Sequence, residues 1–120
     1  MSICVAVTDS NEGRAALEAA AQEALRMDVP LVAVNLTGSA LDTSVISAEQ
    51  PHEVIVPSSP SGLDEIEQVL EVLQDRPEIT RLVVGVRRRS PVGKAVLGSI
   101  AQRLILEAPI PVLSVKSSDA

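Results

Sequence analysis

The chain has 120 residues, of which 46% are hydrophobic and 22% charged, with a net charge of −6 at pH 7 and no aromatic residue. These figures predict a single domain, 1–120, with an aliphatic core. They argue against nucleic-acid binding and exclude stacking of aromatic side chains on bases. No apolar run reaches the ~18 residues of a membrane span, and no secretory signal is recognisable, so we expect a cytoplasmic protein without membrane contact.

Strands and helices are predicted to alternate along the chain. The β-branched run Ile3–Val7 is typical of a buried strand, and the polar cluster Thr8–Glu12 after it is typical of a helix start. Apolar residues at helical spacing then predict a helix over Glu12–Met27. A second buried strand is predicted over Leu31–Leu36, followed by a polar loop over Thr37–Pro51.

The middle of the chain repeats this alternation. Glu53–Val56 predicts a third, short strand, and Ser58–Gly62 is a turn signal. A helix follows whose apolar positions begin at Leu63 and which ends near Pro77. A fourth strand is predicted over Arg81–Val86.

The last third is predicted to contain a loop, a helix and a strand. Arg87–Val96 is charged and contains turn residues, which favours a long loop. Ser99, followed three residues later by Gln102, has the spacing of a capping box and predicts the start of a helix. The apolar run Pro111–Val115 predicts the last strand.

The strands are continuously apolar, which is typical of a sheet covered on both faces. The predicted fold is therefore α/β with an open, mostly parallel sheet. Ligands of such sheets bind beyond the carboxyl ends of the strands, where the strand order reverses. This rule points to Thr8, Asp9, Leu36 and the residues from Gly85 onward.

The charges are divided unevenly along the chain. Residues 79–106 contain six basic residues and no acidic one, whereas the rest of the chain holds all sixteen acidic residues. Gly85 and Gly93 allow close approach to the backbone, and Gly98-Ser99 marks a helix N-terminus, where the dipole favours an anion. The segment therefore predicts a phosphate site, with a solvated basic surface as the alternative.

The same segment carries a family motif. The segment contains Gly85-Val86-Arg87-Arg88, then nine residues, then Gly98-Ser99. This spacing resembles the nucleotide motif of the universal stress protein family. That motif has a glycine, a second glycine three residues later, nine further residues, and then Gly-Ser or Gly-Thr. Ile3–Val7, Ala16-Leu17 and Ala108–Leu113 also resemble the family at its first strand, first helix and last joint.

The resemblance implies a five-stranded sheet of order 3-2-1-4-5 with helices on both faces, here shortened between strands 2 and 3. It further implies a stress-response role, a homodimer through the last strand, 111–116, and binding of ATP or another adenine nucleotide. A branch of the family does not bind ATP. Mg²⁺ is the cation expected to accompany a bound polyphosphate.

The resemblance also assigns roles to residues of this sequence. The adenosine is expected near Thr8, Asp9 and Leu36, and the phosphates at the motif residues Gly85, Arg87, Arg88, Gly98 and Ser99. Two positions depart from the family pattern. Arg88 replaces the second glycine and either caps the phosphate or blocks it, and Thr8 replaces an aspartate, with Asp9 one position later.

Two other functions remain open at this point. The first is a nucleotide-free dimeric interaction module whose basic loop, 87–94, binds an acidic protein. The second is a slow phosphatase or nucleotide hydrolase. The residues offer no convincing pair of nucleophile and general base, because His52 is the only histidine and Cys4 falls in a predicted buried strand, so catalytic and metal-binding residues are not assigned.

Overall fold

The computed structural model of the protein describes residues 1–57, 65–89, 94–96 and 98–117, and within them every side chain except those of 88, 89 and 94–96. In these ranges the chain forms three helices and six strands. They are β1 (Ser2–Thr8), α1 (Asn11–Met27), β2 (Leu31–Leu36), β3 (His52–Ile55), α2 (Glu65–Asp75), β4 (Ile79–Arg89), β5 (Lys94–Val96), α3 (Ser99–Glu107) and β6 (Val112–Ser117).

The sheet confirms the predicted fold. Its parallel strands lie in the order β3-β2-β1-β4-β6, which is the predicted 3-2-1-4-5 when the parallel strands alone are numbered. The strand order reverses between β1 and β4. Residues 37–51, between β2 and β3, contain neither helix nor strand, as expected for a connection that is shortened there.

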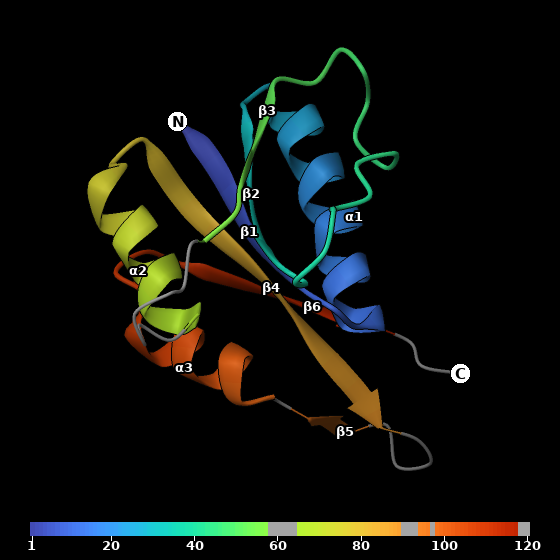
Figure 1. Ribbon diagram of the computed structural model, residues 1–120, viewed down its shortest axis with the longest axis vertical. Coiled ribbons are helices and arrows are strands. Elements are labelled where there is room, and N and C mark those ends of the chain that lie inside the picture. The colour runs from blue at the N-terminus through green and yellow to red at the C-terminus, as the bar shows by residue number, and fades with distance from the viewer. Residues whose placement is uncertain (58–64, 90–93, 97, 118–120) are drawn as a thin grey trace.

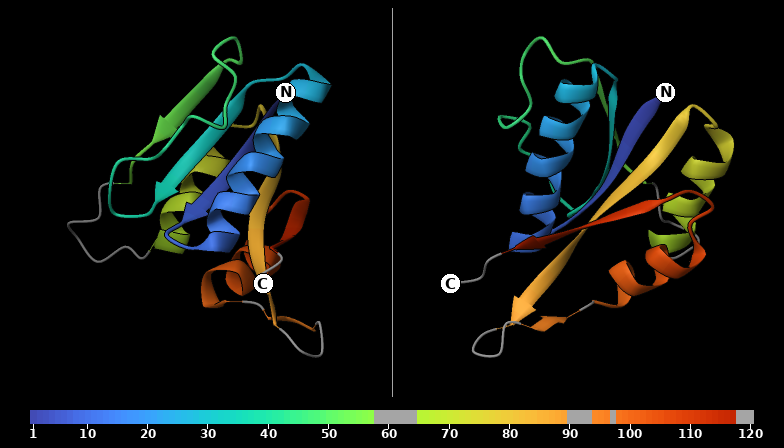
Figure 2. Two further views of the ribbon diagram at one scale, coloured as in Figure 1. Left: turned by 90° about the vertical axis from the view of Figure 1, so that its right-hand side faces the viewer. Right: turned by 180° about the vertical axis from the view of Figure 1, so that it is seen from behind.

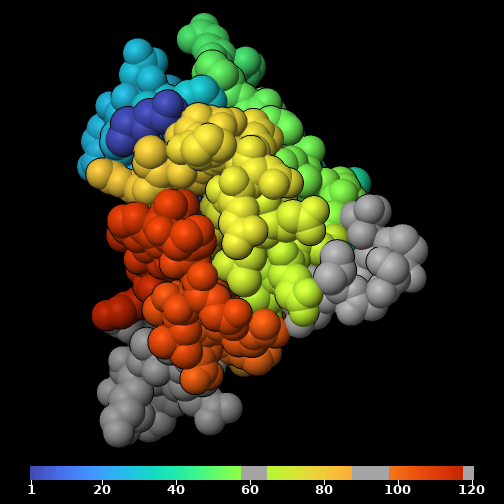
Figure 3. Space-filling model, turned by 90° about the vertical axis from the view of Figure 1, so that its left-hand side faces the viewer, coloured from blue at the N-terminus to red at the C-terminus, as the bar shows by residue number. Residues whose placement is uncertain are grey.

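The helices cover both faces of the sheet (Figures 1 and 2). On one face, Ile3, Val5 and Val7 of β1 pack with Ala16, Leu17 and Ala20 of α1. The opposite face packs against α2 and α3, which lie side by side in Figure 3. Its buried residues include Cys4, Ala6, Val69, Leu73, Leu82, Val84 and Leu104. An aliphatic layer therefore lies between the sheet and the helices on each face, and burial of this apolar surface stabilises the fold.

Local hydrogen bonds set the ends of α1. Ser10 is the N-cap, and its hydroxyl accepts a hydrogen bond from the Gly13 amide at 3.0 Å. Asp28 ends the helix in the left-handed conformation, with φ 57°. Because Ser10 follows β1 by two residues, the first turn of α1 lies directly beyond the end of that strand.

One prediction about the basic segment is wrong. The long loop expected over Arg87–Val96 is replaced by a continuation of β4 to Arg89 and by strand β5, which pairs with it in antiparallel register from Arg87↔Val96 to Arg89↔Lys94. A run of arginines can occupy a strand, because pairing satisfies its backbone groups whatever the side chains are. Residues 90–93 lie outside the described ranges.

The predicted capping box of α3 is also wrong. Gly98 is the N-cap, with extended φ −67° and ψ 163°, and the Gln102 amide donates to its carbonyl oxygen at 2.9 Å. Ser99 is consequently the first helical residue, and its N-cap, a glycine, has no side chain with which to cap the helix. Of the remaining predictions, β3 begins and ends one residue earlier than expected, whereas the turn 58–62 and Leu63 lie outside the described residues.

A buried thiol and an arginine with two acidic partners are two polar features of the fold. Burial raises the pKa of the Cys4 thiol to about 12, so this side chain remains protonated at neutral pH. Arg76 joins the end of α2 to β3 through Glu53, at 2.8 Å, and contacts Glu78 at 3.0 Å. Among the described helices, none combines the length and the apolar character that crossing a membrane requires.

Candidate functional site

The carboxyl ends of β1 and β2 meet the first turns of α1 and α3 at one edge of the sheet (Figure 1). Thr8 and Leu36 are partners in the parallel register of β1 and β2, so the structure brings these two predicted site residues together. The pairing of β1 with β4 stops at Val5 and Val83. Beyond that point the two strands are no longer joined, which is where such sheets bind ligands.

The first turn of α3 lies at this opening. Thr8, Gly85 and Ile100 line a hollow of about 20 Å³, which is close to the space of one water molecule. Gly98 and Ser99, immediately before Ile100, are exposed. The first amides of any helix lack partners within the helix, and none of the side chains that the structure describes caps them here. They are thus available to an anion, as the motif predicts.

A larger groove lies beside Leu36. It has a volume of about 510 Å³, within the range of small-molecule sites, and extends between the ends of β2 and β3 and the start of α2. Buried Asn35 shapes its rim: the Asn35 amide donates to the Ser39 carbonyl at 2.8 Å, and its oxygen accepts from the Thr37 amide at 3.0 Å. Asn35 is not among the residues singled out from the sequence, although an asparagine next to the last residue of a strand, followed shortly by Thr37-Gly38, is a turn signal.

Asp9 lies in a different hollow from Leu36. With Thr8, Arg14 and Leu17 it lines a space of about 290 Å³ on the α1 side of the sheet. Ser39 and Ala40 line both this space and the groove beside Leu36. The Thr8 hydroxyl is 2.8 Å from the Ser10 hydroxyl, which holds it in the β1–α1 turn. Thr8 and Leu36 are therefore neighbours, whereas Asp9 borders the opposite side of the same rim.

Gly85 has a packing role that the sequence does not reveal. A methyl group on Gly85 would overlap the carbonyl oxygen of Glu12 and lie 3.0 Å from its Cβ. The glycine therefore lets β4 pack against the first turn of α1, in addition to lining the hollow beside Thr8. At Gly98, by contrast, a methyl group would meet no described atom within 4 Å.

Of the two arginines of the motif, the structure describes the side chain of Arg87 but only the backbone of Arg88. The Arg87 Nε is 3.7 Å from Oε2 of Glu12, and the arginine side chain is half exposed at the rim. The backbone of Arg88 is paired with Ala95, while its side chain lies outside the description. The structure thus brings Thr8, Leu36, Gly85, Arg87, Gly98 and Ser99 to one edge of the sheet.

The described residues offer little for catalysis at this edge. His52 begins β3 and so lies at the amino end of the parallel strands, where its Nδ1 is 2.8 Å from the Gln50 carbonyl oxygen. Cys4 is buried and protonated at neutral pH, because burial raises its pKa. Within the described part of the chain, no three His, Cys, Asp or Glu side chains are grouped to hold a metal.

Comparison with known proteins agrees with this geometry. The model of the universal stress protein family matches residues 62–116. A universal stress protein of Mycolicibacterium smegmatis is 43% identical over 116 residues, covering 87% of this chain and 88% of the relative.

Two solved structures from Archaeoglobus fulgidus have the same fold. One, a universal stress protein, has a TM-score of 0.70 and 29% identity, covering 97% of this chain and 98% of the other. The second, a universal stress protein in complex with dAMP, has a TM-score of 0.65 and 25% identity, with the same coverage of 97% and 98%. The chain belongs to the universal stress protein family.

Proposed function

We propose that this protein binds an adenine nucleotide at the carboxyl edge of its sheet, as part of a stress response in the cytoplasm. The observation that carries the proposal is the uncapped, exposed first turn of α3 beside Gly85, at the point where the strand order reverses. The relative from Archaeoglobus fulgidus in complex with dAMP supports the same class of ligand.

The rim offers separate surroundings for the two parts of a nucleotide. The phosphate is expected at Gly85, Gly98 and Ser99, where free amides and the dipole of α3 contribute about 0.3–1 kcal/mol for each unit of negative charge near the surface. Arg87, half exposed, supplies countercharge, and Arg88 is proposed to do the same. The base and ribose are expected near Thr8, Asp9 and Leu36, where the groove beside Leu36 has room for them.

Titration calorimetry tests this proposal directly. We expect dAMP, AMP and ATP with Mg²⁺ to release or absorb heat at low salt and to raise the melting temperature, whereas a pyrimidine nucleotide serves as the control for nonspecific anion binding. Absence of heat and of any thermal shift at millimolar concentrations of all three adenine nucleotides would contradict the proposal.

The proposal includes a homodimer formed through β6. In the described residues β6 pairs with β4 alone, and its Leu113 is 46% exposed, so an apolar strand edge is left to a partner. We expect the mass of a dimer by light scattering at tens of micromolar protein. A strictly monomeric mass there would contradict this part of the proposal.

One observation favours a second candidate function. Arg87 is half exposed at the end of β4, so the basic segment 87–94 could contact an acidic protein in place of a nucleotide. A protein that purifies without nucleotide, shows no calorimetric response and retains an acidic partner in a salt-sensitive manner would favour this function over nucleotide binding.

A further inference from the structure

A partly buried carboxylate lies behind the proposed phosphate site. Glu12 is the second residue of α1, and its side chain is only 18% exposed. Its Oε1 is buried and has no hydrogen-bond partner among the described residues, while its Oε2 is 3.7 Å from the Arg87 Nε. Within the described residues, the carboxylate is thus stabilised by one long ion pair and by the N-terminal dipole of α1, while its Oε1 accepts no hydrogen bond.

Glu12 is separated from the first turn of α3 by the backbone of one strand. Its carbonyl oxygen and Cβ pack directly against Gly85, and Gly85 also lines the small hollow that Ile100 of α3 borders. In Figure 1 the first turns of α1 and α3 lie on opposite sides of the end of β4. The carboxylate and a phosphate at α3 would therefore act on each other through protein, where salt screens charges less than in water.

The energy of that interaction depends on the ligand. Coulomb repulsion scales with the product of the two charges, so a triphosphate is disfavoured more than a monophosphate, and an uncharged nucleoside is unaffected. We propose that Glu12 limits the negative charge of the bound nucleotide, so that the site favours adenosine monophosphates over triphosphates. This inference rests on the nucleotide site proposed above.

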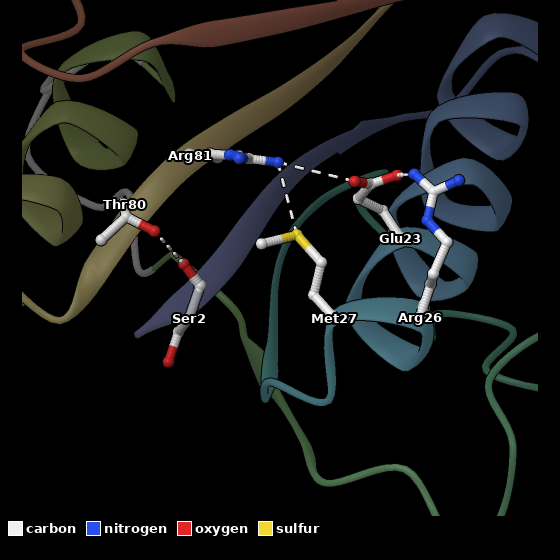
Figure 4. A network of polar contacts seen from close by, with 6 residues as sticks. All are labelled: Ser2, Glu23, Arg26, Met27, Thr80 and Arg81. Carbon is white, nitrogen blue, oxygen red and sulfur yellow. Dashed lines mark hydrogen bonds and ion pairs between the residues drawn. The ribbon is translucent and has the colours of Figure 1, made fainter.

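The chain contains a matched control for Glu12. Glu23 lies further along α1 and pairs with another arginine of β4, Arg81, with 3.5 Å between Oε1 and the arginine nitrogen. Its side chain is 20% exposed, close to the value for Glu12. Figure 4 shows this second pair together with Arg26 and Met27. Because Arg81 is near the amino end of β4, Glu23 is remote from the first turn of α3.

The experiment compares three ligands and three proteins. Adenosine, AMP and ATP are titrated without Mg²⁺, so that ATP keeps its full charge, into the wild type, Glu12→Gln and Glu23→Gln, with thermal melting to confirm that each variant is folded. For Glu12→Gln we expect an unchanged affinity for adenosine, an affinity for AMP about threefold higher and an affinity for ATP about tenfold higher or more. Glu23→Gln should remain within about twofold of the wild type for every ligand.

The possible outcomes distinguish failure of this inference from failure of the proposed function. If AMP binds but Glu12→Gln and Glu23→Gln leave the ratio of ATP to AMP affinity as in the wild type, the inference is overturned and the nucleotide site stands. If no protein binds AMP or ATP, the proposed function fails instead. Should Glu12→Gln not fold, the wild type decides: AMP affinity equal to or above that of ATP supports the inference, and ATP affinity above that of AMP overturns it.

Discussion

Replacing Gly13 with alanine is expected to destabilise the protein by about 3 kcal/mol, although alanine is the better helix former by about 1 kcal/mol. The methyl group would overlap the carbonyl oxygen of Thr8 and lie 2.8 Å from both its carbonyl carbon and its nitrogen. All three are backbone atoms at the end of a central strand, so they cannot move aside without disturbing β1 or the Ser10 cap.

Chemical denaturation measures this effect. In thermal melting, a loss of about 3 kcal/mol in the free energy of unfolding should lower the melting temperature of a domain of this size by roughly 10 °C. Gly98→Ala is the matched control, because a methyl group there meets no described atom within 4 Å, and its stability should stay close to that of the wild type. A Gly13→Ala variant as stable as the wild type would show that the first turn of α1 does not pack on Thr8 as described.

Replacing Gly98 with valine is expected to abolish nucleotide binding and to leave the protein folded. Gly98 is exposed, its backbone is extended and no described atom lies near the position of a Cβ, so we expect the fold to accommodate a larger side chain. A branched side chain at the N-cap stands in front of the first-turn amides that the phosphate needs. We expect an affinity for AMP at least about a hundredfold weaker, because several charge-assisted hydrogen bonds are lost together.

Titration calorimetry on Gly98→Ala and Gly98→Val, which differ in side-chain size, provides the control for this prediction. Gly98→Ala adds one methyl group and should reduce the affinity less than Gly98→Val, while both keep a melting temperature within a few degrees of the wild type, since poor N-caps cost about 1 kcal/mol. Undiminished AMP affinity in a folded Gly98→Val protein would place the phosphate elsewhere.

Much of the architecture is predictable because the strands and α1 are local apolar patterns. Ile3–Val7 and Leu31–Val34 are short apolar runs, and the structure places both in the centre of a covered sheet. The extension of β4 through Arg89 is not predictable in this way. Its charged sequence favours a loop, whereas pairing with β5, and of Arg87 also with Ser117 of β6, makes it a strand.

The candidate site is less completely predictable from the sequence, because it too depends on contacts between residues that are far apart in the chain. The motif predicts phosphate contacts at Gly85, Gly98 and Ser99, and the fold places these residues at the rim with Thr8 and Leu36. The packing of Gly85 against Glu12 joins residues far apart in the chain, and no spacing rule contains it. The same applies to the division of the rim into separate hollows for Asp9 and Leu36, which depends on the path of residues 36–40.

The location of the nucleotide tests the central claim most directly. In a titration of isotopically labelled protein with dAMP, followed by the chemical shifts of backbone amides, the largest changes are expected at Gly85, Ser99 and Ile100, around the opening between β1 and β4. Shifts that saturate but centre on another part of the molecule, with these three amides unchanged at full occupancy, would contradict the account.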